Sequence, residues 1–106
     1  QIVNVPLASG SDGARAREVW QGICARVLDW RPQLILVSAG FDAHADDPLA
    51  FLTWRERDFA AITRMICDTA AACSAPVVSA LEGGYDLAAL GRSARAHVEV
   101  LKETSP

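Results

Sequence analysis

The chain has 106 residues, of which 51% are hydrophobic and 22% charged, and its formal net charge is −3. A chain of this length forms one domain at most, and its apolar content excludes an intrinsically disordered protein. The negative charge gives no support to a nucleic-acid role, and no apolar stretch approaches the roughly 18 residues of a membrane span.

Strands and helices are expected to alternate along the chain in the order β-α-β-α-β-α. The expected strands cover residues 2–5, 34–39 and 77–81, and the expected helices cover about residues 14–30, 54–73 and 87–101. Short β-branched runs between amphipathic segments predict a parallel sheet with right-handed crossovers. The predicted fold class is therefore α/β, with three α/β/α layers.

Polar residues that can cap a helix precede each expected helix. Ser11 or Asp12 can begin the first helix, and Asp86 can begin the last. Thr53 and Glu56 have the spacing of a capping box at the start of the second expected helix.

An acidic cluster follows the second expected strand, and ligands bind at the carboxyl ends of strands in open parallel sheets. Asp42 comes directly after Gly40 and can point into such a site, although a turn-capping carboxylate is the alternative. His44 is expected at the solvent edge or beside a ligand. Asp46 and Asp47 are expected to fix the loop through Asx-type hydrogen bonds ahead of the following proline.

The third expected strand ends in a second conspicuous segment, Glu82-Gly-Gly-Tyr85. Paired glycines let the backbone approach a ligand closely or turn sharply before a helix. Tyr85 is the only tyrosine in the chain, and it is either a functional phenol or a residue that packs at the start of the helix.

The two segments Ser38-Ala-Gly-Phe-Asp-Ala-His-Ala-Asp-Asp-Pro-Leu49 and Leu81-Glu-Gly-Gly-Tyr-Asp-Leu87 resemble the C-terminal part of the zinc-dependent histone deacetylase superfamily. The resemblance is to the branch of class II-like enzymes and bacterial acetylpolyamine amidohydrolases. It covers nearly the whole chain but only the last part of a typical deacetylase domain. It implies that residues 1–106 are an incomplete portion of an arginase/deacetylase-type fold, whose missing strands cover the sheet edges.

The resemblance also implies a role for each motif residue. Asp42 would be a zinc ligand, and the Tyr85 phenol would donate a hydrogen bond to the acyl oxygen of the substrate. Leu49 would line the substrate channel, with packing as its alternative role, and Gly83 and Gly84 would border the substrate. The implied activity is zinc-dependent removal of acetyl or other acyl groups from acetyl-lysine or acetylpolyamine-like substrates.

Two parts of such a site are missing from the sequence. The family uses an Asp-x-His pair of zinc ligands and two adjacent histidines as the base, and neither precedes Asp42 here. His97 is expected to be an ordinary helix-face residue of the last helix, far from the site. The isolated chain is therefore expected to be inactive, and to need the remainder of the catalytic domain as a partner.

Other classes of protein fit less well. A signal-receiver domain needs an acidic pair after the first strand and a lysine after a later one, whereas the only lysine is Lys102. A nucleotide-binding module could use Gly83 and Gly84 at a helix start, but Glu82 would repel phosphate. A non-catalytic scaffold or interaction fragment with the same fold is the main alternative.

Two further expectations concern the cell and the assembly. Cys24, Cys67 and Cys73 lack metal-site spacing and are expected to be reduced thiols of a cytoplasmic protein. Unpaired edges of a small sheet favour self-association into a homo-oligomer.

Overall fold

Helices and parallel strands alternate in the computed structural model, which describes residues 2–104. The five elements are, in chain order, α1 (Gly13–Trp30), β1 (Ile35–Ala39), α2 (Glu56–Ala72), β2 (Val77–Leu81) and α3 (Leu87–Thr104). β1 and β2 pair in parallel, with Ile35 opposite Val77 and Ala39 opposite Leu81. The α/β class with a parallel sheet is confirmed.

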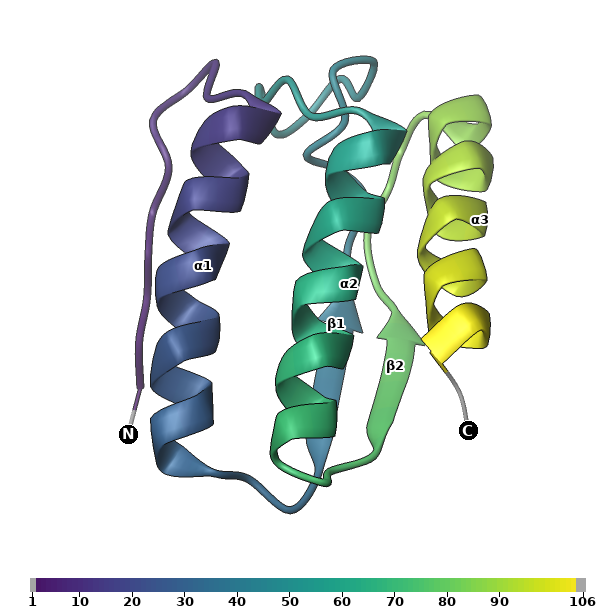
Figure 1. Cartoon of the computed structure of the whole chain (residues 1–106). Helices are drawn as coiled ribbons and strands as arrows, with labels where there is room; N and C mark the ends of the chain where they lie inside the picture. The colour runs from purple at the N-terminus through teal and green to yellow at the C-terminus, as the bar shows by residue number, and fades with distance from the viewer. Residues whose placement is uncertain (1, 105–106) are drawn as a thin grey trace.

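The described helices cover one face of the two-stranded sheet (Figure 1). Ile35 and Val77 pack against α1 and α2 on this face. The Ser79 hydroxyl is hydrogen-bonded to His97 Nε2 of α3, at 2.8 Å, on the same face. On the opposite face Leu36 is 71% exposed and Val78 is 54% exposed. Residues 2–104 thus supply the sheet and one helical layer, and they leave the other face of the sheet bare.

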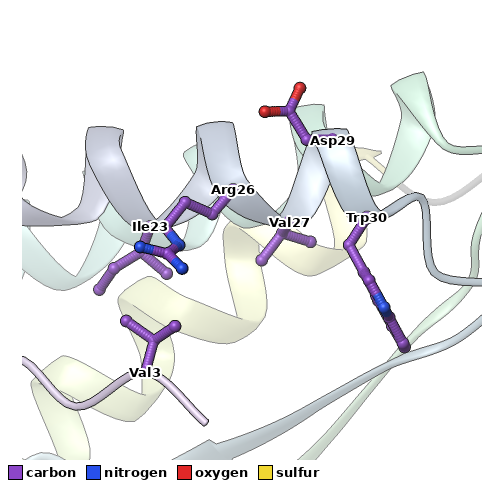
Figure 2. Close-up of a pocket in the computed structure, with 6 residues that line it drawn as sticks. All are labelled: Val3, Ile23, Arg26, Val27, Asp29 and Trp30. Carbon is purple, nitrogen blue, oxygen red and sulfur yellow. The ribbon is translucent and has the colours of Figure 1, made fainter. Parts of the chain in front are cut away.

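The expected first strand is not formed. Residues 2–5 are extended but unpaired, and they run beside α1 rather than along an edge of the sheet (Figure 1). Figure 2 shows Val3 facing Ile23 across a groove of about 590 Å³ that Val27 and Trp30 also line. A β-branched run becomes a strand only where a neighbour accepts its backbone hydrogen bonds, and α1 offers none.

Asp12 begins α1 as expected, because its side chain accepts a 3.0 Å hydrogen bond from the Arg15 N–H. The predicted capping box at Thr53 is wrong. The Thr53 hydroxyl lies 3.2 Å from the Ser11 carbonyl instead, and α2 begins at Glu56. The contact between Thr53 and Ser11, which are distant in sequence, therefore overrides the local capping signal at Thr53.

Asp58 caps α2 in place of Thr53. Its buried carboxylate accepts a 2.8 Å hydrogen bond from the Arg55 N–H and pairs with Arg17 of α1. Gly13 of α1 faces the same carboxylate, where a Cβ atom would collide with it. Asp58 thus fixes the start of α2 and its contact with α1.

Two small apolar clusters form the core between the helices and the sheet. The cluster near the end of β1 contains Ala39, Phe41, Ala43 and Phe59, and the one between α1 and α2 contains Ala16, Ile62 and Ile66. Val37 and Trp54 pack against both clusters. Burial of these side chains holds the strand ends, and hence the loops that follow them, against the first turns of α2 and α3.

The three cysteines are free thiols, as expected. Cys24 lies in α1, Cys67 is buried in α2, and Cys73 ends that helix. None of the helices within residues 2–104 is both long and apolar enough to cross a membrane.

Candidate active site

The loops that follow β1 and β2 meet at one end of the sheet, beside the starts of the helices (Figure 1). Hydrogen bonds continue the pairing beyond the strands: the Glu82 N–H donates to the Ala39 carbonyl at 2.9 Å, and the Phe41 N–H donates to the Gly83 carbonyl at 2.8 Å. The segment that carries Asp42 is therefore held directly against the glycine pair.

Asp42 and Tyr85 both border Gly83. A Cβ atom built on Gly83 would lie 3.1 Å from the Tyr85 hydroxyl oxygen and 3.5 Å from the Asp42 carboxylate carbon. The two groups can therefore be no farther apart than the sum of those distances, which one small acyl group can span. Tyr85 is 56% exposed.

The backbone requires a glycine at position 84, and Gly83 lies in a narrow space. Gly84 has a φ of +141°, and a Cβ atom there would lie 2.7 Å from Leu90 Cδ1. A side chain on Gly83 would fill the space between Asp42 and Tyr85. The glycine pair thus leaves open the space that the two functional groups share.

Asp47 joins the two loops. Its Oδ1 accepts a 2.8 Å hydrogen bond from the Leu49 N–H, which is the expected Asx-type turn. Its Oδ2 accepts a second 2.8 Å bond from the Tyr85 N–H, 38 residues away in the sequence. Sequence reasoning missed this second bond, because no local pattern indicates it.

Two apolar side chains are exposed in the same loop. Leu49, expected to line a substrate channel, is 59% exposed, and Phe51 is 68% exposed. Phe51 also has a φ of +58°, which is uncommon for an aromatic residue. Neither side chain packs in the described core, so both are available for contacts outside it.

Of the two positions expected for His44, the solvent edge is wrong, because His44 is fully buried. Its Nδ1 accepts a 3.0 Å hydrogen bond from the Asp46 N–H, so its Nε2–H donates to Glu56 Oε1, also at 3.0 Å. The imidazole thus ties the acidic loop to the first turn of α2. It supports the loop from beneath and has no exposed nitrogen to offer a substrate.

Glu56 is the centre of a small polar network beside this loop. Arg92 of α3 donates from Nε to Glu56 Oε1 at 2.6 Å. The pKa of Glu56 is lowered from 4.5 to about 2, and this bond is the largest cause. The backbone amide of Glu56 and the His44 side chain also lower the pKa, whereas burial raises it. The network links the starts of α2 and α3 next to the site.

His97, expected as an ordinary helix-face residue, is buried on the inward face of α3. Its Nδ1 is 2.8 Å from the Thr63 hydroxyl, and its Nε2 is 2.8 Å from the Ser79 hydroxyl. The Thr63 hydroxyl itself donates to the Phe59 carbonyl at 2.6 Å, so it accepts from His97. Burial lowers the pKa of His97, and the imidazole joins the helical layer to β2.

The described residues do not form a complete metal site. No group of three or more His, Cys, Asp and Glu side chains within residues 2–104 is arranged to hold a metal ion. Asp42 is a single, partly exposed carboxylate, whereas a catalytic zinc needs about three protein ligands. Zinc binding at Asp42 therefore requires further ligands from outside residues 2–104.

The fold and these loops define a parallel α/β protein whose polar groups converge at the carboxyl ends of its strands. Residues 1–101 match the Histone deacetylase domain family. The chain belongs to this family.

Curated relatives agree with that assignment. Type-2 histone deacetylase 1 of Dictyostelium discoideum is 40% identical over 103 residues, which cover 96% of this chain and 7% of the relative. Histone deacetylase 18 of Arabidopsis thaliana is 38% identical over 95% of this chain and 15% of its own length. The chain therefore spans only a small part of these relatives.

Solved structures share the fold. The HDA15 HD domain superposes with a TM-score of 0.86 at 30% identity, over 98% of this chain and 31% of that one. An acetylpolyamine aminohydrolase from Burkholderia pseudomallei gives a TM-score of 0.84 at 26% identity, over 96% of this chain and 29% of that one. In both proteins the equivalent elements are part of a chain about three times as long.

Proposed function

We propose that this chain is the C-terminal portion of a zinc-dependent deacylase domain, to which it supplies one zinc ligand and the oxyanion donor. The observation that carries the proposal is the convergence of the Asp42 carboxylate and the Tyr85 hydroxyl around Gly83. Membership of a deacetylase family supports hydrolysis of an acylated amine as the reaction.

In the complete domain, Asp42 would bind zinc together with ligands that residues 2–104 do not contain. Bound zinc supplies a Lewis acid that polarises the amide carbonyl and activates water. Tyr85 would donate its phenol proton in a hydrogen bond to the carbonyl oxygen as negative charge develops there. A preorganised donor of this kind typically contributes a hundredfold or more to the rate.

The substrate would be an acetylated lysine or an acetylpolyamine. The exposed Leu49 and Phe51 are suited to contact the alkyl chain of either one. The similar TM-scores to the HDA15 HD domain and to an acetylpolyamine aminohydrolase favour neither substrate. A cytoplasmic location, which free thiols favour, stays a prediction.

Tyr85→Phe in the complete domain tests the proposal. We expect turnover of an acetyl-lysine peptide or acetylpolyamine to fall about a hundredfold or more. Zinc content, measured by atomic emission, should not change. Undiminished turnover would remove Tyr85 from the mechanism, whereas a wild-type domain without turnover would favour the non-catalytic scaffold.

A matched pair of carboxylate variants tests the metal role. Asp42→Asn should lose both zinc and turnover, whereas Asp46→Asn in the same loop should keep both. The 106-residue chain alone should show no tight zinc binding by isothermal titration and no hydrolysis, because it offers one ligand. Tight stoichiometric binding by that chain would contradict the proposed incomplete site.

A further inference from the structure

Asp47 is a buried carboxylate that the proposed chemistry does not use. It is only 8% exposed, and each of its oxygens accepts one backbone hydrogen bond at 2.8 Å. Within residues 2–104 no arginine, lysine or histidine side chain forms an ion pair with it. Its charge is therefore held by two amides, those of Leu49 and Tyr85.

A turn within the loop accounts for only one of these bonds. An Asx-type turn needs one side-chain oxygen, which here accepts from the Leu49 N–H two residues ahead. The second oxygen reaches the Tyr85 N–H, which lies in the loop after β2. Asp47 therefore has a function beyond shaping its own loop.

Tyr85 lies in a short segment between two held points: the Gly83 carbonyl accepts from the Phe41 N–H, and the Asp86 carbonyl accepts from the Leu90 N–H in α3. Tyr85 is 56% exposed, so the described residues cover less than half of its surface. It follows two glycines, and glycine gives the backbone more conformational freedom than any other residue. The hydrogen bond from its own N–H to Asp47 is thus a direct restraint on the backbone that carries the phenol.

We propose that Asp47 is a positioning residue, which holds the Tyr85 backbone and the exposed Leu49 in fixed relation across the site. This inference rests on the proposed role of Tyr85 as oxyanion donor. A carboxylate suits the task because both of its oxygens accept, whereas an amide side chain has one acceptor and a serine hydroxyl cannot span both amides. Charge-assisted bonds to backbone amides are also stronger than neutral ones.

The anchor is tested directly by amide hydrogen exchange and ¹H–¹⁵N NMR on the 106-residue chain. Asp47→Ser should keep the short turn to Leu49 but speed exchange of the Tyr85 amide about tenfold or more, the loss of a bond worth about 1.4 kcal/mol. Asp46→Asn is the matched control and should leave that amide unchanged. Unaltered exchange at Tyr85 in Asp47→Ser would overturn the anchor.

Asp47→Asn decides the question if the serine variant does not fold. Asparagine keeps the size of the side chain but has one acceptor oxygen, so either the Leu49 amide or the Tyr85 amide must lose its protection. Full protection of both amides would overturn the proposal.

A double-mutant cycle in the complete domain distinguishes positioning of Tyr85 from a general structural role. Asp47→Asn alone should lower kcat about tenfold to a hundredfold, the cost of a misplaced catalytic group, with a smaller change in KM. In the Tyr85→Phe background it should lower kcat no further, because the hydroxyl that it positions is gone. Equal losses in both backgrounds would assign Asp47 a structural role only.

The two proposals can fail separately. A wild-type complete domain without amide hydrolysis would end the proposed function, while the exchange measurement would still decide whether Asp47 anchors Tyr85.

Discussion

Gly84 and Gly91 have opposite surroundings, although they lie seven residues apart. Gly84 has a φ of +141° and no room for a Cβ atom, whereas a Cβ atom on Gly91 in α3 would meet nothing within 4 Å. Gly84→Ala should therefore lower the free energy of unfolding by about 1–3 kcal/mol. Gly91→Ala should raise it by about 0.5–1 kcal/mol, because alanine favours the helix.

Urea titration of the two variants measures both effects. A neutral Gly84→Ala would mean that the loop after β2 relaxes without strain, and that the glycine pair is not needed for the local backbone.

Glu56 provides a test of the polar network. Its pKa of about 2 depends first on Arg92, so Arg92→Leu should raise that pKa toward 4.5 in a ¹³C-detected NMR titration. Arg95→Leu in the same helix is the control, because Arg95 pairs with Glu99 instead.

The pH dependence of stability follows from the direction of this shift. The folded pKa of Glu56 lies below its unfolded value, so its stabilising contribution is fully present above pH 4.5 and is lost as the pH falls toward 2. Arg92→Leu should therefore flatten this part of the stability profile. A Glu56 pKa that stays near 2 in Arg92→Leu would contradict the assigned cause.

At the scale of elements, α1 and α2 are joined by one buried ion pair. Asp58 is almost fully buried, and its partner Arg17 is about one third exposed. Arg17→Met should leave that carboxylate with an unpaired charge and lower the free energy of unfolding by about 1.5–3 kcal/mol.

The control for this pair is Arg15→Met on the same helix. Arg15 and Glu18 form an exposed pair, so its loss should cost under about 1 kcal/mol. Equal effects of the two substitutions would mean that Asp58 is held by the Arg55 amide alone.

The elements also show which features the sequence could predict. β1, β2 and the start of α1 at Asp12 follow from local signals, namely short apolar runs and a capping side chain. The strand at residues 2–5 was predicted wrongly, because a strand depends on a partner edge that composition does not reveal. Thr53 failed as a cap for a similar reason, since its hydroxyl contacts Ser11 from a distant part of the chain.

The candidate site divides in the same way. Asp42 and Tyr85 could be found from their motifs, and parallel strands bring the carboxyl ends of β1 and β2 together. The burial of His44 and the bond from Asp47 to the Tyr85 amide could not be predicted, because both depend on contacts between segments distant in sequence. Supporting residues of a site are in general harder to identify than the groups that react.

At the scale of the whole molecule, the main feature is the face of the sheet that no described helix covers. Leu36 and Val78 are both more than half exposed on neighbouring strands, and their side chains point away from all three described helices. The solved relatives place the same elements in a chain about three times as long, so the remainder of a deacetylase domain is the expected cover. Without it, an exposed apolar face of this kind favours association between copies.

We therefore expect the 106-residue chain to form dimers or larger species in sedimentation velocity runs, in proportions that rise with concentration. Leu36→Thr with Val78→Thr should shift the chain toward monomer, because threonine keeps β propensity while removing apolar surface. Leu87→Ala with Val98→Ala removes exposed apolar surface from α3 and should not change the distribution. A chain that stays monomeric, or that responds equally to both pairs, would mean that the bare sheet face does not drive association.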